Sequence, residues 1–301
     1  MASAARSWRV SVAVALLGVG LVAAPVVFQM FTRAPKGGDM ITSFEPYMSS
    51  TKIDEFRGYL TAIGTAESEV RARQIQAANL ARDWPVINSD MRAMLDTMER
   101  NITNYEGVAA LPPFPLFPWF FVIPGVLLAG LGATAVRRPQ AARRLTAATL
   151  AIGLGLIAAP GIFQMFTRAP GGARMIDDFR PLMTTEKVTA IQGYFLSLGA
   201  AEGELRNDVL PTRTAELPAT QHFVDAWPRI SFDMAPMIGT MADSLDNFAA
   251  VDALPDFWLF PWFFVLPGVL VAGLSLAGRR GSEAPLPTRT PQRDLVEGQP
   301  A

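Results

Sequence analysis

Four glutamates are the side chains of this sequence best suited to binding a cation, because they recur as two matched pairs. Glu67 and Glu69 lie in one half of the chain, and Glu202 and Glu204 hold the same positions in a second, similar stretch. Carboxylate oxygens are the ligands that hard cations such as Ca²⁺ prefer, so two pairs facing each other could form such a site. Charges of this kind more often lie on a solvated surface or pair with a nearby arginine. We therefore predict no metal site, and keep Glu67 and Glu202 as candidate contacts for a ligand or partner.

A stripe of methionines marks the same two halves of the chain. Its members recur at spacings of three and four residues, and they are Met91, Met94, Met98, Met234, Met237 and Met241. This spacing places them on one face of a helix, where methionine commonly fills irregular gaps in a hydrophobic core. An adaptable groove for an apolar ligand or a partner helix is the second interpretation, and thioether binding of Cu(I) is the third. All six are candidate ligand or partner contacts.

Arg33 and Arg168 each follow an apolar segment within the octapeptide FQMFTRAP, which occurs twice without a change. We expect their long side chains to reach the lipid headgroups, with binding of a specific anionic lipid as the alternative. The single histidine, His222, has no counterpart in the other half, and we expect it on the surface or in a loop. One histidine cannot supply a histidine-rich metal site.

The rest of the sequence offers no catalytic signature. It contains no P-loop motif, no H-E-x-x-H and no G-x-S-x-G, and it has no cysteine for a disulfide or a thiolate site. The formal net charge is −1, which gives no support for a nucleic-acid partner. We therefore expect a protein that is not an enzyme and holds no cofactor.

The chain consists of one unit written twice. Besides the octapeptide, the stretch Phe117 to Gly125 returns as Phe260 to Gly268 with one substitution, Ile123 to Leu266. The offset between matching residues rises from 135 (33 to 168) to 143 (117 to 260), so the second copy carries eight extra residues, within Arg206 to Ala226. Such a repeat indicates that both halves form the same arrangement of elements.

Four apolar spans contain no Asp, Glu, Lys or Arg, and each holds roughly 17–22 residues, enough to cross the hydrocarbon core of a bilayer. Most acidic residues lie in the two long segments between spans, whereas the short flanks are basic, as in the loop with Arg137, Arg138, Arg143 and Arg144. Basic residues mark the cytoplasmic side of membrane helices. We therefore expect a multi-pass protein of a bacterial cell membrane, with both termini in the cytoplasm and the lipid bilayer around it.

The predicted fold is an all-α integral membrane protein with four transmembrane helices and a helical extracytoplasmic bundle. Its two tandem repeats, each of the form transmembrane–ectodomain–transmembrane, are related by a pseudo-twofold axis along the membrane normal. The predicted segments are a cytoplasmic N-terminus 1–9, a first span 10–31, an extracytoplasmic repeat 32–117, a second span 118–136, a cytoplasmic loop 137–145, a third span 146–166, a second extracytoplasmic repeat 167–260, a fourth span 261–278 and a disordered cytoplasmic tail 279–301.

Prolines and helical spacing predict the local structure outside the spans. Thr32 to Gly38, with Pro35 and two glycines, is expected to break the helix after the first span. Pro85 is expected in the first turn of a later helix. Between them, residues 51–70 are expected to form an amphipathic helix. Its apolar face is Ile53, Phe56, Leu60 and Ile63.

Glycines predict close contacts. Gly58 and Gly64 lie inside the amphipathic helix, where glycine is unfavourable, so we expect a close backbone contact there between the two copies. In the first span, Gly20 and Ala24 form a small-xxx-small pair, which we expect to pack against another membrane helix of the same bundle. Homodimerisation through a face left uncovered is the alternative.

Two functions fit these features. The first is a non-enzymatic integral membrane protein whose duplicated helical ectodomain binds a membrane or envelope protein partner, or supports an envelope complex. The alternative is a carrier or transporter subunit for a lipid or another apolar small molecule, using a groove lined by methionine and phenylalanine between the repeats. A cavity open to the bilayer beside Phe28, Met30, Met94 and their copies in the second half would favour the carrier, and a filled core would count against it. A membrane enzyme that uses the paired carboxylates is a third, weaker interpretation.

Overall fold

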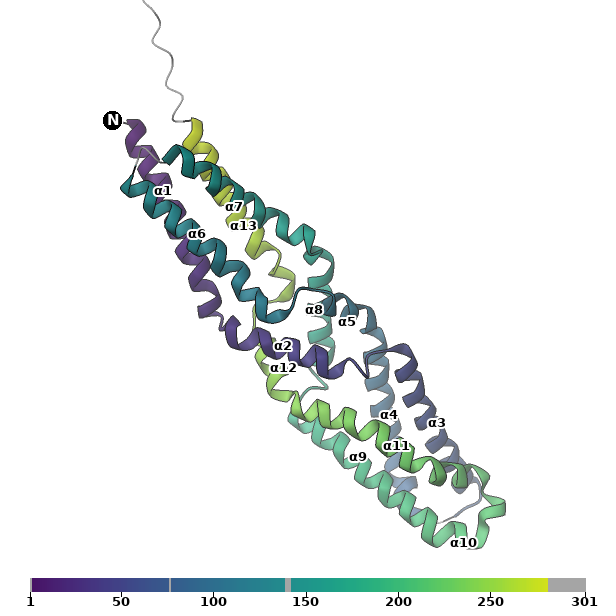
Figure 1. The fold of residues 1–301 in the computed structure, drawn as a ribbon. Coiled ribbons are helices and arrows are strands. Elements are labelled where there is room, and N and C mark those ends of the chain that lie inside the picture. Colours follow the sequence, from purple (N-terminus) through teal and green to yellow (C-terminus); the bar gives the residue numbers. More distant parts are fainter. Residues whose placement is uncertain (1, 76, 139–141, 281–301) are drawn as a thin grey trace, which may run out of the picture.

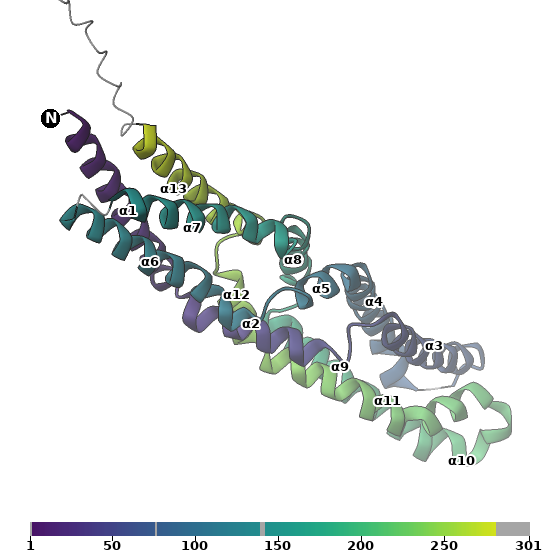
Figure 2. The same cartoon turned by 45° about the horizontal axis from the view of Figure 1, so that its top comes forward.

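The computed structural model describes residues 2–75, 77–138 and 142–280. Every regular element within these ranges is a helix, as expected, and no strand occurs there. Figures 1 and 2 show a long molecule with one group of helices at each end and short helices in the middle. The predicted tail lies outside the described residues from position 281 onward.

Four helices are long and apolar enough to cross a membrane, which indicates a membrane protein. They are α1 (Ala2–Val27), α6 (Phe117–Arg137), α7 (Ala142–Ile162) and α13 (Trp262–Arg280). Between 22% and 28% of their apolar stretches is buried inside the molecule. A helix surface that is apolar and largely uncovered suits contact with lipid rather than water.

Each half brings its own two long apolar helices together. α1 packs along α6, α7 packs along α13, and the two pairs meet through α1 with α13 and α6 with α7. Gly18 on α1 faces the backbone of Gly125 and Ala129 on α6, where an added Cβ would lie only 2.4 Å from the Ala129 nitrogen. Gly153 on α7 approaches the α13 backbone in the same way. Small residues thus allow the helix backbones to touch, as is common in membranes.

Four helices at the opposite end surround one apolar core, here called the distal core. They are α3 (Ser50–Ala72), α4 (Ala78–Arg100), α9 (Thr185–Glu204) and α11 (Pro218–Asp243). α3 packs on α4 from its own half and on α11 from the other, while α9 packs on α11 and across to α4. The predicted apolar face of the first of these helices is confirmed, because its members are each at most 1% exposed: Ile53, Phe56, Leu60 and Ile63.

Shorter helices connect the two ends of the molecule. They are α2 (Met30–Phe44), α5 (Ile102–Ala109), α8 (Met165–Phe179) and α12 (Leu245–Asp252). α2 packs against α12, and α8 packs against α5, so each pair combines elements of different halves. The main partner of each connecting helix therefore comes from the other half, whereas each long apolar helix and each helix of the distal core packs on helices of both halves.

The extra residues of the second half lie between α9 and α11, within the predicted interval. They contribute to a π-helical turn η3 (Leu205–Val209), the short helix α10 (Leu210–Arg213) and a 3-10 turn η4 (Thr214–Glu216). His222 follows on α11 with an exposed side chain, so its surface position is confirmed, on a helix rather than in a loop.

The expected helix break over Thr32 to Gly38 is wrong, because α2 runs unbroken through this stretch. The chain turns earlier, at Gln29, whose φ of 53° and ψ of 34° lie in the left-handed region. Gln164 adopts the same angles between α7 and α8. Pro35 removes a single N–H group from a helix that has already begun, and the remaining hydrogen bonds suffice to continue it.

Two further local predictions are wrong. Pro85 lies inside α4, which begins at Ala78, because the first turn of this helix is held by a side chain from the other half, described below. A Cβ on Gly58 would meet nothing within 4 Å, and Gly64 faces the ring of Trp84, which belongs to the same half. Neither glycine therefore marks a backbone contact between the copies.

Candidate functional site

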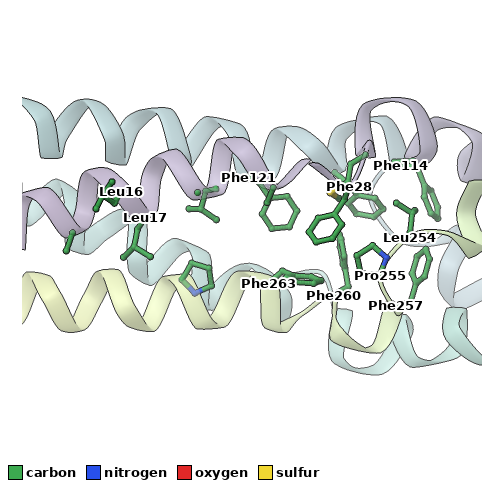
Figure 3. A pocket seen from close by; sticks show the side chains of 18 residues that line it. Leu16, Leu17, Phe28, Phe114, Phe121, Leu254, Pro255, Phe257, Phe260 and Phe263 are labelled. Atoms are coloured by element: carbon green, nitrogen blue, oxygen red, sulfur yellow. The ribbon is translucent and has the colours of Figure 1, made fainter. Parts of the chain in front are cut away.

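A cavity of about 540 Å³ opens among the long apolar helices. Its walls come from α1, the start of α2, the turn η1 (Phe114–Leu116) with the start of α6, the turn η5 (Phe257–Leu259) with the residues before it, and α13. Every lining residue is apolar, and Figure 3 shows several of them, namely Leu16, Leu17, Phe28, Phe121, Leu254 and Phe263. A space of this size and character can hold an apolar molecule, but it offers no group for acid–base chemistry.

The cavity extends from the middle of α1 to the C-terminal end of this helix and slightly beyond, here called the outer end of the cavity. Leu16 and Leu17 line it well inside the apolar stretch of α1, whereas Ala34 on α2 and Leu254 after α12 line it beyond that stretch. One end is therefore surrounded by helices suited to lipid, and the other end lies where the chain leaves them (Figure 3).

Small residues on α1 make room for the cavity. Gly20 and Ala24 both line it, and a Cβ added at Gly20 would meet nothing within 4 Å. Packing of this pair against another membrane helix is therefore wrong for Gly20. Gly18 takes that role instead, since two residues correspond to a rotation of about 200° around a helix.

Aromatic rings form the wall at the outer end. The ring centroids of Phe117 and Phe260 lie 5.0 Å apart in an edge-to-face arrangement, and those of Phe28 and Phe263 lie 6.2 Å apart. Such pairs stabilise a defined geometry beyond their buried area. The rings therefore link the end of α1, the start of α6 and the start of α13.

Arg33 lies at the rim of this end. Its Nη1 donates a hydrogen bond of 2.8 Å to the carbonyl of Ala253, next to the lining residue Leu254. Arg168 makes the matching bond, 2.7 Å, to the carbonyl of Ala110. Each arginine thus caps the C-terminus of a helix in the other half, where a positive charge is favoured. This capping role was not predicted from the sequence. Among the candidate ligand or partner contacts, Arg33 is the one that lies beside the cavity.

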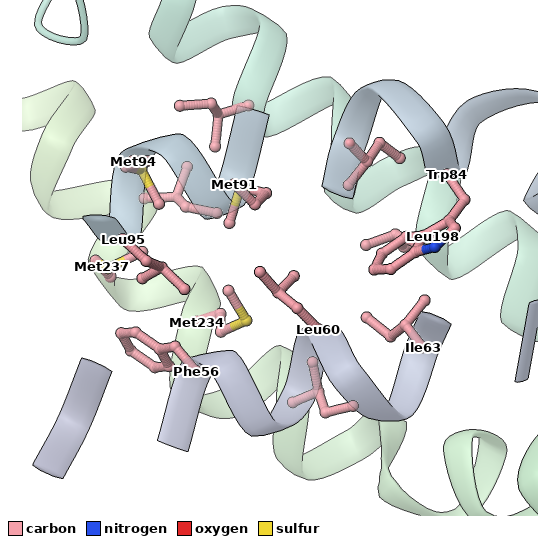
Figure 4. Packing of buried hydrophobic residues seen from close by; sticks show 14 of the residues in the cluster. Phe56, Leu60, Ile63, Trp84, Met91, Met94, Leu95, Leu198, Met234 and Met237 are labelled. Atoms are coloured by element: carbon pink, nitrogen blue, oxygen red, sulfur yellow. The ribbon is translucent and has the colours of Figure 1, made fainter. Parts of the chain in front are cut away.

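The six candidate methionines lie in the distal core, away from this cavity. None of the six is more than 4% exposed. Figure 4 shows four of them, Met91, Met94, Met234 and Met237, among apolar side chains such as Phe56 and Leu60. A space of about 20 Å³ lies between the pairs Met94 with Met98 and Met237 with Met241, which suits a single water at most. Core filling is therefore the role that their burial supports, and the groove expected along them is not open at this face.

Two of the four paired glutamates form ion pairs along their own helical segment, and the other two join helices of different halves. Glu67 pairs with Arg71 and Glu202 with Arg206, each one helical turn away. Glu69 accepts hydrogen bonds from the start of α11, and Glu204 accepts one from the backbone N–H of Asn79 at the start of α4, 3.3 Å. Within residues 2–75, 77–138 and 142–280, no group of three or more acidic or histidine side chains is placed to hold a metal ion.

Two matching polar clusters between the halves were missed by the sequence reasoning. The hydroxyl of Tyr59 on α3 lies 2.5 Å from a carboxylate oxygen of Asp233 on α11. In the matching place, Asp90 on α4 accepts hydrogen bonds from Tyr194 and from Lys187, the latter 2.6 Å, both on α9. The bond from Lys187 lowers the pKa of Asp90, and burial together with the bond to Asp90 raises the pKa of Tyr194 to about 12. The recurrence of each residue in both copies was the signal, but it did not identify the partners.

No protein-family model matches this chain, and no curated protein matches it either. The structure defines the class as an all-helical protein with four helices able to cross a membrane. Its most specific feature is the apolar cavity between α1 and α13.

Proposed function

We propose that this protein is a non-enzymatic carrier, or a subunit of one, that holds an acyl chain of a membrane lipid between α1 and α13. The observation that supports this function is the cavity of about 540 Å³ with its wholly apolar lining. Pockets for small molecules commonly measure about 300–1,000 Å³. The part of the cavity beside Leu16 and Leu17 lies between helices suited to a bilayer. The apolar molecules that surround such helices are membrane lipids.

We infer the orientation from charge and repetition. Basic residues lie in the first turns of α1, on both sides of the loop between α6 and α7, and at the last residues of α13, which supports placing both termini and the middle loop in the cytoplasm of a bacterial cell. The distal core and its four helices then form an extracytoplasmic bundle. Since each half contributes an even number of spans, the two halves insert in the same direction and are related by a pseudo-twofold axis along the membrane normal.

Native mass spectrometry of the full chain, purified gently from its own host, tests the proposal. We expect one lipid to stay bound to the wild-type protein. Gly20→Leu should reduce this occupancy at least several-fold, because the new side chain enters the cavity without a clash. Gly130→Leu is the matched control, since Gly130 lies exposed on α6, away from the cavity, and also has free space around it.

The other outcomes are equally informative. Wild-type protein without lipid, or equal lipid retention in Gly20→Leu and Gly130→Leu, would overturn the carrier proposal. A stoichiometric protein partner in the absence of lipid would support the alternative function, in which the extracytoplasmic helices bind an envelope partner.

A further inference from the structure

The rim of the cavity carries positive charge on one side. Arg33 and Lys36 lie three residues apart on α2, so their side chains leave the same side of this helix. Arg33 is next to the lining residue Ala34, and its guanidinium lies beside Leu254, which also lines the cavity. Arg33 therefore lies at the outer end of the apolar space, and Lys36 lies about one helical turn further along α2.

Most of the hydrogen-bonding capacity of these two cations is unused. A guanidinium has five N–H groups, and the contact between Arg33 and the Ala253 carbonyl occupies one of them. Lys36 forms no ion pair or hydrogen bond through its side chain with any residue that the structure describes. Asp252, which precedes Ala253 in the sequence, is already paired with Arg180 at 2.7 Å. Asp256, in the turn that lines the cavity, forms no ion pair with either cation among the described residues.

The depth of the cations suits a lipid headgroup. The apolar stretch of α1 ends at Val27, and Arg33 follows six residues later, just beyond the turn at Gln29 and in the first turn of α2. The headgroup layer on each side of a bilayer is roughly 5–8 Å thick. Long basic side chains bend toward this layer while their stems stay on apolar surface.

The two halves differ at this position. Arg33 corresponds to Arg168, but Lys36 corresponds to Gly171, so the second half lacks the adjacent cation. Arg168 makes the same cap on a helix C-terminus as Arg33 does. It therefore provides a control that separates loss of the cap from loss of a ligand contact.

We propose that the lipid held in the cavity is anionic, with its acyl chain between α1 and α13 and its phosphate bound by Arg33 and Lys36. This inference rests on the proposed function and adds the chemical class of the ligand. The phosphate of the lipid accepts charge-assisted hydrogen bonds from both side chains. In a zwitterionic lipid, the positive group of the headgroup repels these two cations and weakens the attraction.

The test is a competition between lipids with identical acyl chains. The full chain in mild detergent is mixed with equal amounts of phosphatidylglycerol and phosphatidylcholine, and native mass spectrometry counts the bound molecules of each. We expect phosphatidylglycerol to be retained about tenfold more, the scale of one charge-assisted contact. The double variant Arg33→Gln with Lys36→Gln should keep binding lipid but lose this preference, whereas Arg168→Gln should keep both.

The other outcomes show whether the anionic-lipid inference fails alone or together with the carrier function. Lipid binding without preference in the wild type, or a preference that survives the double variant, overturns the anionic-lipid inference and leaves the carrier function standing. Absence of bound lipid in the wild type overturns both. Equal retention of phosphatidylglycerol in Gly20→Leu and Gly130→Leu also overturns both, because the lipid would then bind elsewhere. Inorganic phosphate added in excess should not displace the lipid; displacement would show that a free phosphate site explains the binding.

Discussion

Glu69 receives two hydrogen bonds from Thr220, one from its backbone N–H and one from its hydroxyl, each 2.8 Å. The carboxylate belongs to α3 of the first half, and Thr220 belongs to the first turn of α11 in the second half. A side chain from a distant part of the sequence thus caps the helix, a task that a neighbouring Ser, Thr, Asp or Asn usually performs.

Glu69→Ala should lower the free energy of unfolding by about 1–2 kcal/mol, the usual cost of losing an N-terminal cap. Denaturant titration in detergent, followed by helical circular dichroism, measures this change. Glu106→Ala provides the control, because Glu106 is exposed and forms no ion pair with any described residue; it should change stability by less than about 0.5 kcal/mol. Equal stability of the two variants would contradict the capping role.

Acid should weaken the contact between α3 and α11. Hydrogen bonds from Lys52, Tyr59 and Arg229 lower the pKa of Glu55 from 4.5 to about 2. Because the folded state holds this group in its charged form, the stabilisation is complete above pH 4.5 and disappears as the pH falls toward 2. Melting temperatures across this range should fall less steeply for Glu55→Gln than for the wild type. Parallel curves would show that Glu55 is not part of the acid response.

Gly18 and Gly20 should respond in opposite ways to the same small substitution. A Cβ at Gly18 would lie 2.4 Å from the Ala129 nitrogen, so Gly18→Ala must separate α1 from α6 and should cost about 1–3 kcal/mol. Gly20→Ala extends into the cavity and should be neutral or stabilising by up to about 1 kcal/mol, because alanine favours a helix. Thermal unfolding of both variants in the same detergent compares them directly. A stable Gly18→Ala variant would argue against the close approach.

The left-handed backbone of Gln29 predicts an unusual benefit from glycine. A residue with a side chain pays about 1–2 kcal/mol for this conformation, and glycine adopts it freely. Gln29→Gly should therefore raise the unfolding temperature, and Gln29→Val should lower it. In the interior of α9, Gln192→Gly should instead destabilise by up to about 1 kcal/mol. A loss of stability in both glycine variants would mean that the turn at Gln29 does not persist in the membrane protein.

The features that depend on composition and spacing along one helix were predictable. The four apolar helices follow from the charge-free spans, and the face of Ile53, Phe56, Leu60 and Ile63 follows from its period. The turn at Gln29 was missed because Pro35 gives a stronger local signal than a glutamine can. Phe28 and Met30 line the cavity as expected, but Met94 lies in the distal core. The role of Gly20 was missed because helical spacing does not decide which of Gly18 and Gly20 faces a neighbouring helix.

The features that depend on distant parts of the chain were not predictable. The partner of Glu69 is 151 residues away, and the partner of Arg33 is 220 residues away. Recurrence in both copies marked these side chains as important to the fold, yet a symmetric pattern fits contacts within each half as well as contacts between halves. Only the exchange of helices in three dimensions distinguishes the two arrangements.

The exchange of partners between halves also sets the order in which the molecule can be made. α3 and α4 are finished at Arg100, but α11, which packs on α3, begins only at Pro218. At ribosomal speeds of about 5–20 residues per second, the apolar faces of the first two helices wait roughly 6–24 s for their counterparts. During this interval a newly made first half exposes surfaces that fit a second half, including one on a neighbouring nascent chain. Because both copies are part of one polypeptide, the second half is present at a high effective concentration near the first. This favours packing within the chain over packing with another chain.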